Sequence, residues 1–333
     1  MNAENKDDVR LPIEGDILTT HTGESIIIHQ KLGNGAMGQV FLGKLNERNF
    51  AVKTEKKALG LIPLEVKLLL TAKRENFNHF CTIYGYGKVS KAYNFMIMSL
   101  LNSDLYQLRM ECPNRIFSMN TTTQIAIQSL KAMEELHSIG YIHRDIKSSN
   151  FAPGRGRCST IFIFDFGLSR RFVDGSNMKL SPRKNVGWRG TVRYASLNAH
   201  KQLDLSRRDD IESWLYMLIE MKLGSLPWCF LRERNQVGNS KMIIRTDRAN
   251  FFSNLPKQFQ EIMDIIDNYD FESCPNYPKL KKLVEKIRIN DNCDEAEMKW
   301  DWETAELSII GTVSVKSVAI MAENGSNNIS SPE

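Results

Sequence analysis

The chain has 333 residues, of which 42% are hydrophobic and 25% charged, and its formal net charge is +5. This length suffices for one large domain or two lobes, and the composition is ordinary for a soluble globular protein. The small positive excess indicates acidic or phosphorylated partners, but it is too small to indicate nucleic acid. No apolar run approaches the roughly 20 residues that cross a bilayer, so we expect no membrane span.

The cysteines and the first residues point to the reducing interior of a cell. Six cysteines are scattered without a C-x-x-C pair, which argues against a zinc site and a disulfide scaffold. The N-terminal segment shows no secretory signal. We therefore expect a cytoplasmic protein, with the nucleus as an alternative location. We also expect the protein to be a monomer.

Residues 1–23 are polar, and we expect them to form an N-terminal extension. After them come short segments rich in β-forming residues, which predict strands: SIIIHQKLG, QVFLGKL and NFAVKTE. A helix is predicted from Pro63 because proline suits a first helical turn. The following YNFMIMSLL predicts another buried strand.

Helices dominate the rest of the chain. NTTTQIAIQSLKAMEELHSIG has a 3.6-residue apolar period, and 210–223 and 257–268 behave alike. A strand-rich first third before a helix-rich remainder predicts an α+β, two-lobed fold. We expect it at 24–303, divided into an N-lobe, a hinge and a C-lobe at 24–98, 99–102 and 103–303.

The last residues, 304–333, are expected to form a partly disordered tail, because they end in the polar ENGSNNISSPE. Within this tail, 307–322 is unusually apolar. The sequence leaves open whether that segment packs back on the C-lobe or binds a partner.

A glycine-rich segment, GNGAMGQV, lies between two predicted strands and contains Gly33, Gly35 and Gly38. Glycines let a backbone approach phosphate groups closely. A tight hairpin explains the pattern equally well. A dinucleotide-binding fold is disfavoured, because it requires a helix directly after the glycines.

Lys53 lies on an apolar strand, and Glu65 lies near the start of the next predicted helix. An ion pair between them would hold the ammonium group against α- and β-phosphate oxygens. Taken singly, Lys53 also fits an edge lysine that reaches water, and Glu65 fits a carboxylate facing a helix dipole.

The segment YIHRDIKSSNF is more specific. Asp145 would accept or orient the proton of an attacking hydroxyl, Lys147 would neutralise the transferred phosphoryl group, and Asn150 would bind a metal ion. Farther on, Asp165 closes the apolar strand IFIFD, and a magnesium ion that bridges phosphates would compensate its charge. A polar surface loop and a buried turn carboxylate are the alternatives.

Together these segments, in this order, resemble the eukaryotic-type protein kinases over roughly residues 25–303. The resemblance implies ATP and Mg²⁺ as cofactors and protein hydroxyl groups as phosphate acceptors. It also implies that the adenine lies between Val40, Ala51 and Ala152. Met98 would guard the back pocket, and the Leu101 backbone would hydrogen-bond the adenine edge. Taken singly, each of these apolar residues fits an ordinary core.

Two further features refine the resemblance. Lys147 after the catalytic aspartate, together with Thr191 in GTVRY, is the serine/threonine arrangement, and Thr191 would hydrogen-bond Asp145 and Lys147. Asp210 precedes the apolar helix IESWLYMLIEM. It would cap that helix and brace the backbone of the HRD loop.

Where most kinases carry Ala-Pro-Glu, this chain carries RGTVRYASLNAH. That string, with SRRDDIESWLYML, GSLPW and DWE, resembles the casein kinase 1 group, and RNQVG and LEVKLL are most similar to its tau-tubulin kinase branch. Such kinases favour serines or threonines preceded by acidic or phosphorylated residues. Lys184, Arg189 and Arg193 are the predicted anion receptors, with solvated loop charges as the alternative.

Two other functions remain open: a kinase-fold scaffold without turnover, and a cytoskeleton-binding module suggested by the tubulin-associated branch. The intact catalytic residues weigh against the scaffold. Met37, in place of an aromatic residue, and Ser99, in place of a hinge carboxylate, depart from the kinase pattern. These departures put loop closure and ribose binding in doubt, and they remove no catalytic group.

Overall fold

The computed structural model describes residues 10–35, 38–89, 92–156, 158–184, 186–291, 293 and 299–303. The described chain divides into two compact units. The first comprises the described residues up to 76 together with 80–102, and the second comprises 77–79 and the described residues from 103 onward. The expected tail at 304–333 and the departure at Met37 lie outside the described residues.

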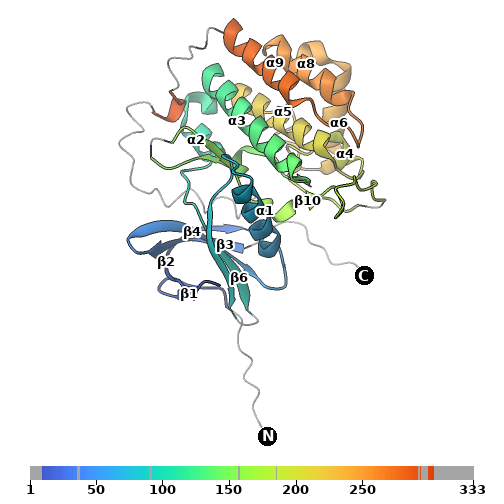
Figure 1. Ribbon diagram of the computed structural model, residues 1–333. Coiled ribbons are helices and arrows are strands. Elements are labelled where there is room, and N and C mark those ends of the chain that lie inside the picture. The colour runs from blue at the N-terminus through green and yellow to red at the C-terminus, as the bar shows by residue number, and fades with distance from the viewer. Residues whose placement is uncertain are drawn as a thin grey trace. The chain divides into compact units, whose positions relative to one another are not determined.

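The first unit is built on a six-stranded antiparallel sheet in the order β1-β2-β3-β4-β6-β5 (Figure 1). Its core contains Ile26, Ile28, Val52 and Phe95, all fully buried. Its elements are β1 (Ile17–Thr19), β2 (Ser25–Gly35), β3 (Gly38–Leu45), β4 (Arg48–Lys56), α1 (Ile62–Arg74), β5 (Ile83–Val89) and β6 (Tyr93–Met98).

Part of the expected extension at 1–23 is folded, because β1 pairs with β2 at the edge of this sheet. The buried side chain of Leu18 joins the core of the sheet. A three-residue strand between polar residues carries too little alternation to be recognised in the sequence.

The start of α1 depends on a side chain of the sheet. Pro63 stands in its first turn, and the Glu55 carboxylate of β4 accepts hydrogen bonds from the backbone N–H groups of Leu61 and Ile62. Amide groups that have no partner within a helix are thereby satisfied. This contact fixes α1 against β4, and Glu65 lies on α1.

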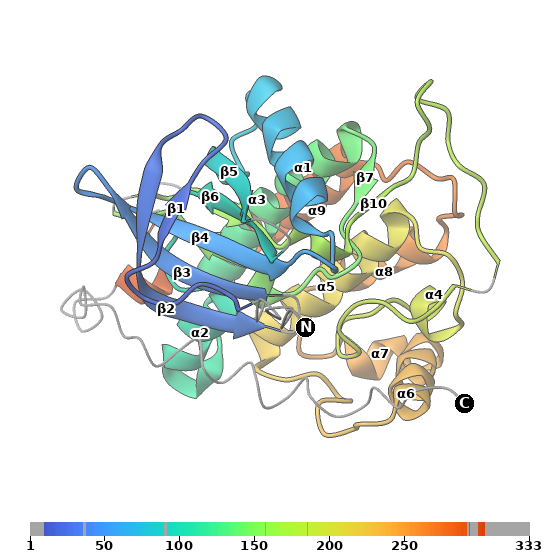
Figure 2. The same ribbon diagram turned by 90° about the horizontal axis from the view of Figure 1, so that it is seen from below.

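The second unit is mainly helical. Figure 1 and Figure 2 show its helices gathered around α5, which packs against α3 and α8. The helices are α2 (Leu105–Glu111), α3 (Met119–Ser138), α4 (Leu197–His200), α5 (Arg207–Leu223), α6 (Arg234–Thr246), α7 (Arg248–Phe251), α8 (Lys257–Asp267) and α9 (Tyr277–Asn290). Two small antiparallel sheets pair β7 (Tyr141–Ile142) with β10 (Arg170–Arg171), and β8 (Phe151–Pro153) with β9 (Ile161–Ile163).

The central helix α5 is buried on almost every side, from Asp209 to Met221. A capping box between Ser206 and Asp209 begins it, and Gly224, with a φ of +81°, follows its last turn. Its first two turns therefore hold Asp210 and Glu212 in fixed positions deep inside the unit.

The α+β prediction, with a β-rich N-terminal lobe and a helical C-terminal lobe, is confirmed. The helix expected from Pro63 spans 62–74, and those expected at 210–223 and 257–268 span 207–223 and 257–267. Within the described part of the chain, no helix is both long and apolar enough to cross a bilayer.

Candidate active site

The first unit contributes a buried ion pair. Lys53 of β4 and Glu65 of α1 approach to 2.6 Å between Nζ and Oε1, and their side chains are 11% and 2% exposed. The sequence predicted this pair, and the structure brings the two residues together. The low exposure of both side chains protects the pair from solvent screening.

The glycine-rich segment forms the ends of β2 and β3. Gly33 pairs with Val40, and Gly35 with Gly38, across the two strands. A Cβ at Gly38 would lie 2.0 Å from the carbonyl oxygen of Thr54, so this position excludes any side chain. Close packing of the backbone on β4 is therefore one reason for glycine here, whatever the segment binds.

The expected adenine contacts fall in both units. Ala51 of β4 is the cross-strand partner of Met98 of β6, Val40 is on β3, and Leu101 follows β6 by a few residues. Ala152, which is 1% exposed, lies in β8 of the second unit.

In the second unit, Asp145 is held by three neighbouring residues. Its Oδ1 accepts hydrogen bonds of 2.8 Å from both the backbone N–H and the hydroxyl group of Thr191. Its Oδ2 lies 2.8 Å from the ammonium group of Lys147, which also donates to the Thr191 hydroxyl over 3.2 Å. Asn150 donates to the backbone carbonyl of Asp145 over 2.8 Å. The predicted contacts of Thr191 with Asp145 and Lys147 are present.

Gly190 lets this arrangement form. Its φ is +89°, and a Cβ there would lie 2.5 Å from the carbonyl oxygen of Arg144. Any other residue would push the backbone of Thr191 away from Asp145. The backbone of Gly190 therefore packs directly against the backbone of Arg144, and this packing keeps Thr191 beside Asp145.

Asp210 braces the backbone beside Asp145. Its carboxylate accepts hydrogen bonds from the N–H groups of His143 and Arg144, at 2.7 and 2.8 Å, and from His137 Nε2 at 2.8 Å. Burial acts to raise the pKa of Asp210, but the hydrogen bond and charge of His137 outweigh it, and the pKa is lowered. Arg144 has a left-handed φ of +68°, which this carboxylate helps to maintain.

Two oxygen donors suit a magnesium ion. Asn150 uses its Nδ2 on Asp145, so its Oδ1 points away from that residue and can act as a ligand. The N–H of Phe164 donates to the backbone carbonyl of Asn150, which places the next residue, Asp165, near Asn150. An amide oxygen and a carboxylate are ligands that Mg²⁺ prefers, so these residues fit the ion.

A basic pocket lies beside the catalytic segment. Its volume is about 230 Å³, and its wall includes Arg144, Arg183, Lys184, Trp188 and Arg189. Burial and then the charges of the neighbouring Arg183 and Arg170 lower the pKa of Arg144 to about 10. Such a concentration of cations favours an anionic ligand.

The structure places the three predicted anion receptors in two different surroundings. Lys184 and Arg189 line the basic pocket. Arg193 does not, since its guanidinium lies 3.1 Å from the buried carboxylate of Glu220. Its neighbour Tyr194 also donates to Glu220.

The prediction missed Asp204 at the edge of this pocket. Its carboxylate accepts from Arg170 and Arg183, and Arg183 is thereby oriented. Burial acts to raise the pKa of Asp204, but hydrogen bonds from Arg183 and Arg170 lower it to about 2. An isolated aspartate in a polar stretch carries no local signal of this role.

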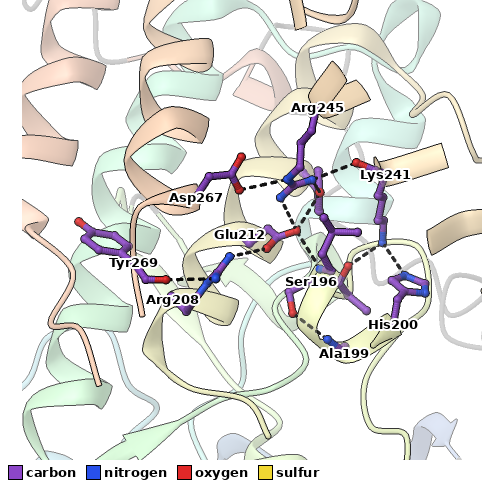
Figure 3. A network of polar contacts seen from close by, with 12 residues as sticks. Ser196, Ala199, His200, Arg208, Glu212, Lys241, Arg245, Asp267 and Tyr269 are labelled. Carbon is purple, nitrogen blue, oxygen red and sulfur yellow. Dashed lines mark hydrogen bonds and ion pairs between the residues drawn. The ribbon is translucent and has the colours of Figure 1, made fainter. Parts of the chain in front are cut away.

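Figure 3 shows a buried network of charges that includes residues of α4, α5 and α6. Glu212 of α5, which is fully buried, accepts from the backbone N–H of Leu197 at 2.9 Å and from Arg245 at 2.8 Å. Ser196 caps α4 by accepting from the N–H of Ala199. The segment that stands in place of Ala-Pro-Glu is therefore anchored by a glutamate from α5.

The protein kinase domain model matches residues 26–287 of the chain. The chain belongs to the protein kinase family. Among its relatives, a probable serine/threonine-protein kinase of Dictyostelium discoideum is 35% identical over 278 residues, which are 82% of this chain and 55% of that protein. The serine/threonine-protein kinase spe-6 of Caenorhabditis elegans is 32% identical over 316 residues, which are 91% of this chain and 82% of that protein. The chain thus spans little more than half of the Dictyostelium relative, and both names agree with the serine/threonine class.

Proposed function

We propose that this chain is a Mg²⁺- and ATP-dependent serine/threonine protein kinase that prefers hydroxyl groups preceded by acidic or phosphorylated residues. The observation that carries the proposal is the contact of Asp145 with both Lys147 and Thr191. An aspartate held in this way can accept a hydroxyl proton beside a fixed cation.

The proposed reaction forms a bond between the substrate hydroxyl oxygen and the γ-phosphorus of ATP, while the bond from that phosphorus to the β–γ bridging oxygen breaks. ADP leaves with the electron pair, and Asp145 receives the hydroxyl proton. Lys147 compensates charge on the transferred group, and Lys53, oriented by Glu65, holds phosphate oxygens. Magnesium, bound by Asn150 and Asp165, would neutralise phosphate charge.

The acidic or primed preference is supported by the basic pocket. Four cationic side chains face a volume of about 230 Å³, and they are Arg144, Arg183, Lys184 and Arg189. A phosphate or carboxylate on the substrate would relieve their mutual repulsion. Arg193 would contribute through its charge near Glu220 rather than as a wall of this pocket.

We also propose membership in the casein kinase 1 group and its tau-tubulin kinase branch, on the strength of the RGTVRYASLNAH and RNQVG strings. Cytoskeletal proteins are accordingly the proposed substrate class. A cytoplasmic location, with the nucleus as the alternative, is also proposed, and the free cysteines among the described residues are compatible with it.

The test uses purified protein and three matched peptides that carry an acidic, a phosphorylated or a neutral residue before one serine. Wild type should phosphorylate all three, with the highest kcat/KM on the first two. Asp145→Asn should lower the rate by about 10³-fold or more while keeping the melting temperature. If wild type and Asp145→Asn are equally inert, the scaffold function replaces this proposal.

The same assay tests the preference. Lys184→Ala with Arg189→Ala should lower kcat/KM on the acidic and phosphorylated peptides about ten-fold, and on the neutral peptide less than about two-fold. Lys201→Ala removes an exposed lysine that is not among the described residues of the pocket wall, and serves as the control. Equal losses on all three peptides would remove the anion preference and leave the kinase activity intact.

A further inference from the structure

Lys241 of α6 is a lysine with no exposed surface. Its ammonium group donates to the backbone carbonyls of Val192 at 2.9 Å and of Ala195 at 2.6 Å. It also lies 3.2 Å from His200 Nε2, as Figure 3 shows. A buried ammonium group is costly unless acceptors surround it. Here all three acceptors belong to the segment that follows Gly190.

Two aromatic rings complete the surroundings of this ammonium group. Tyr216 of α5 and Trp228 each have their ring centroid 5.1 Å from Lys241 Nζ. Trp228 also donates its indole N–H to the carbonyl oxygen of Arg193 at 2.7 Å. Lys241 and Trp228 therefore hold carbonyl groups of Val192, Arg193 and Ala195 from one side.

Asp145 holds the other end of the same segment, which we name the substrate loop and define as residues 191–195. Thr191 gives its N–H and its hydroxyl group to Asp145. The loop is short, so a shift at Val192 or Ala195 is transmitted to Thr191. Asp145 thus holds the first residue of the loop, and Lys241 holds Val192 and Ala195.

The sequence also provides for the close approach of α6. Gly238, one turn before Lys241, would place a Cβ 3.0 Å from the ring of His200. A larger residue would press on α4 through this ring and move α6 away from it. The buried charge has a counter-charge on α5, because Glu212 attracts Lys241, while burial lowers the pKa of Lys241 to about 7.

We propose that Lys241 is a positioning residue for substrate recognition, which fixes the substrate loop so that Thr191 stays on Asp145 and the loop presents one surface to an acceptor peptide. This inference rests on the proposed kinase function. It assigns to a buried lysine on α6 a role in peptide affinity, without contact between that lysine and the peptide.

The experiment compares Lys241→Met, which keeps the length of the side chain and removes its charge, with the exposed Lys201→Met as control. Peptide Kd is measured by fluorescence anisotropy of the acidic peptide, MgATP affinity by calorimetry, and loop order by hydrogen–deuterium exchange of residues 190–200. Lys241→Met should raise the peptide Kd about ten-fold and speed exchange in 190–200, with MgATP affinity changed less than about two-fold. Lys201→Met should change none of the three.

A milder variant keeps the inference testable if Lys241→Met does not fold. Trp228→Phe keeps an aromatic ring at position 228 and removes the hydrogen bond to Arg193, together with part of the buried indole volume. It should raise the peptide Kd about three-fold, with the same local change in exchange. If Lys241→Met does not fold, this variant decides the question.

Parallel losses of peptide and MgATP affinity in the deciding variant would overturn the inference, because they would indicate general destabilisation. Unchanged exchange at 190–200 would overturn it as well. Since Kd and exchange need no turnover, they also separate this inference from the proposed reaction. A wild-type protein that binds peptide without phosphorylating it would refute the kinase activity and leave the role of Lys241 standing.

Discussion

The basic pocket and the network around Glu212 are built from the same kinds of charged residue, but the two arrangements serve different purposes. In the pocket, cations such as Arg144 and Lys184 face an open volume of about 230 Å³. In the network, Glu212 is fully buried and meets Arg245 and Arg208 at 2.8 and 3.4 Å. Surplus charge around an open volume is suited to a ligand, whereas matched charge in a packed interior is suited to holding the chain.

The largest expected effect comes from breaking the matched charges. Glu212→Ala leaves Arg245 and the N–H of Leu197 without their carboxylate, so the free energy of unfolding should fall by about 3–5 kcal/mol in urea titrations. The control is Glu285→Ala, which removes a surface pair with Lys281 whose glutamate is 46% exposed. That change should cost less than about 1 kcal/mol. Similar losses in both variants would show that the buried charges around Glu212 hold the chain no better than a surface ion pair does.

A second change acts between the two regions, at Gly190. Gly190→Ala forces a Cβ to within 2.5 Å of the Arg144 carbonyl, so Thr191 must move away from Asp145. Peptide phosphorylation should fall by about ten-fold or more, which corresponds to at least about 1.4 kcal/mol of transition-state stabilisation. Gly175→Ala is the matched control, because a Cβ there meets nothing within 4 Å. Full activity of Gly190→Ala in steady-state assays would show that the loop tolerates a shift at this position.

The smallest expected effect is a pH dependence at His200, which borders the network. Burial and then the charge of Lys241 lower the pKa of His200 from 6.5 to about 4. Between these values the unfolded state takes up a proton that the folded state does not, so stability contributed by neutral His200 is lost as the pH falls from 6.5 towards 4.

Melting temperatures of wild type and His200→Gln, measured at several pH values between 7 and 4, check this dependence. The other acid-sensitive groups are common to both proteins, so the difference between the two curves isolates His200. The decline of wild type should be steeper below pH 6.5. Parallel curves would mean that His200 is protonated in the folded protein as readily as in the unfolded one.

The candidate catalytic residues were accessible to sequence reasoning because each lies in a short, specific string. Asp145 and Asn150 share one loop, and Asp210 could be placed by the apolar helix that follows it. The structure puts the Asp210 carboxylate on the N–H groups of His143 and Arg144, as expected of a brace. Such contacts are local or depend on one helix with a recognisable start.

Other contacts left no trace in the sequence. Lys241 lies on the same face of α6 as the buried Val237 and Ile244, but the residue type predicts an ammonium group that reaches water, and its acceptors are 41 to 49 positions away. Glu212 lies in a helix that is apolar on nearly all sides, where no period reveals which neighbour it meets. The partners of these charges are set by how α4, α5 and α6 pack, and that packing is decided by the whole core.

The hydrogen bonds around His137 join residues that are synthesised at very different times. Because Asp210 is a carboxylate, His137 donates to it from Nε2, and His137 Nδ1 lies 2.6 Å from the hydroxyl oxygen of Tyr277. Tyr277 begins α9 and stands 140 positions after His137. A chain is synthesised from its N-terminus, so Asp145 leaves the ribosome long before Tyr277, whose hydroxyl group contacts the His137 ring that binds Asp210. The nascent chain thus carries the catalytic strings well before it can hold them in their final arrangement.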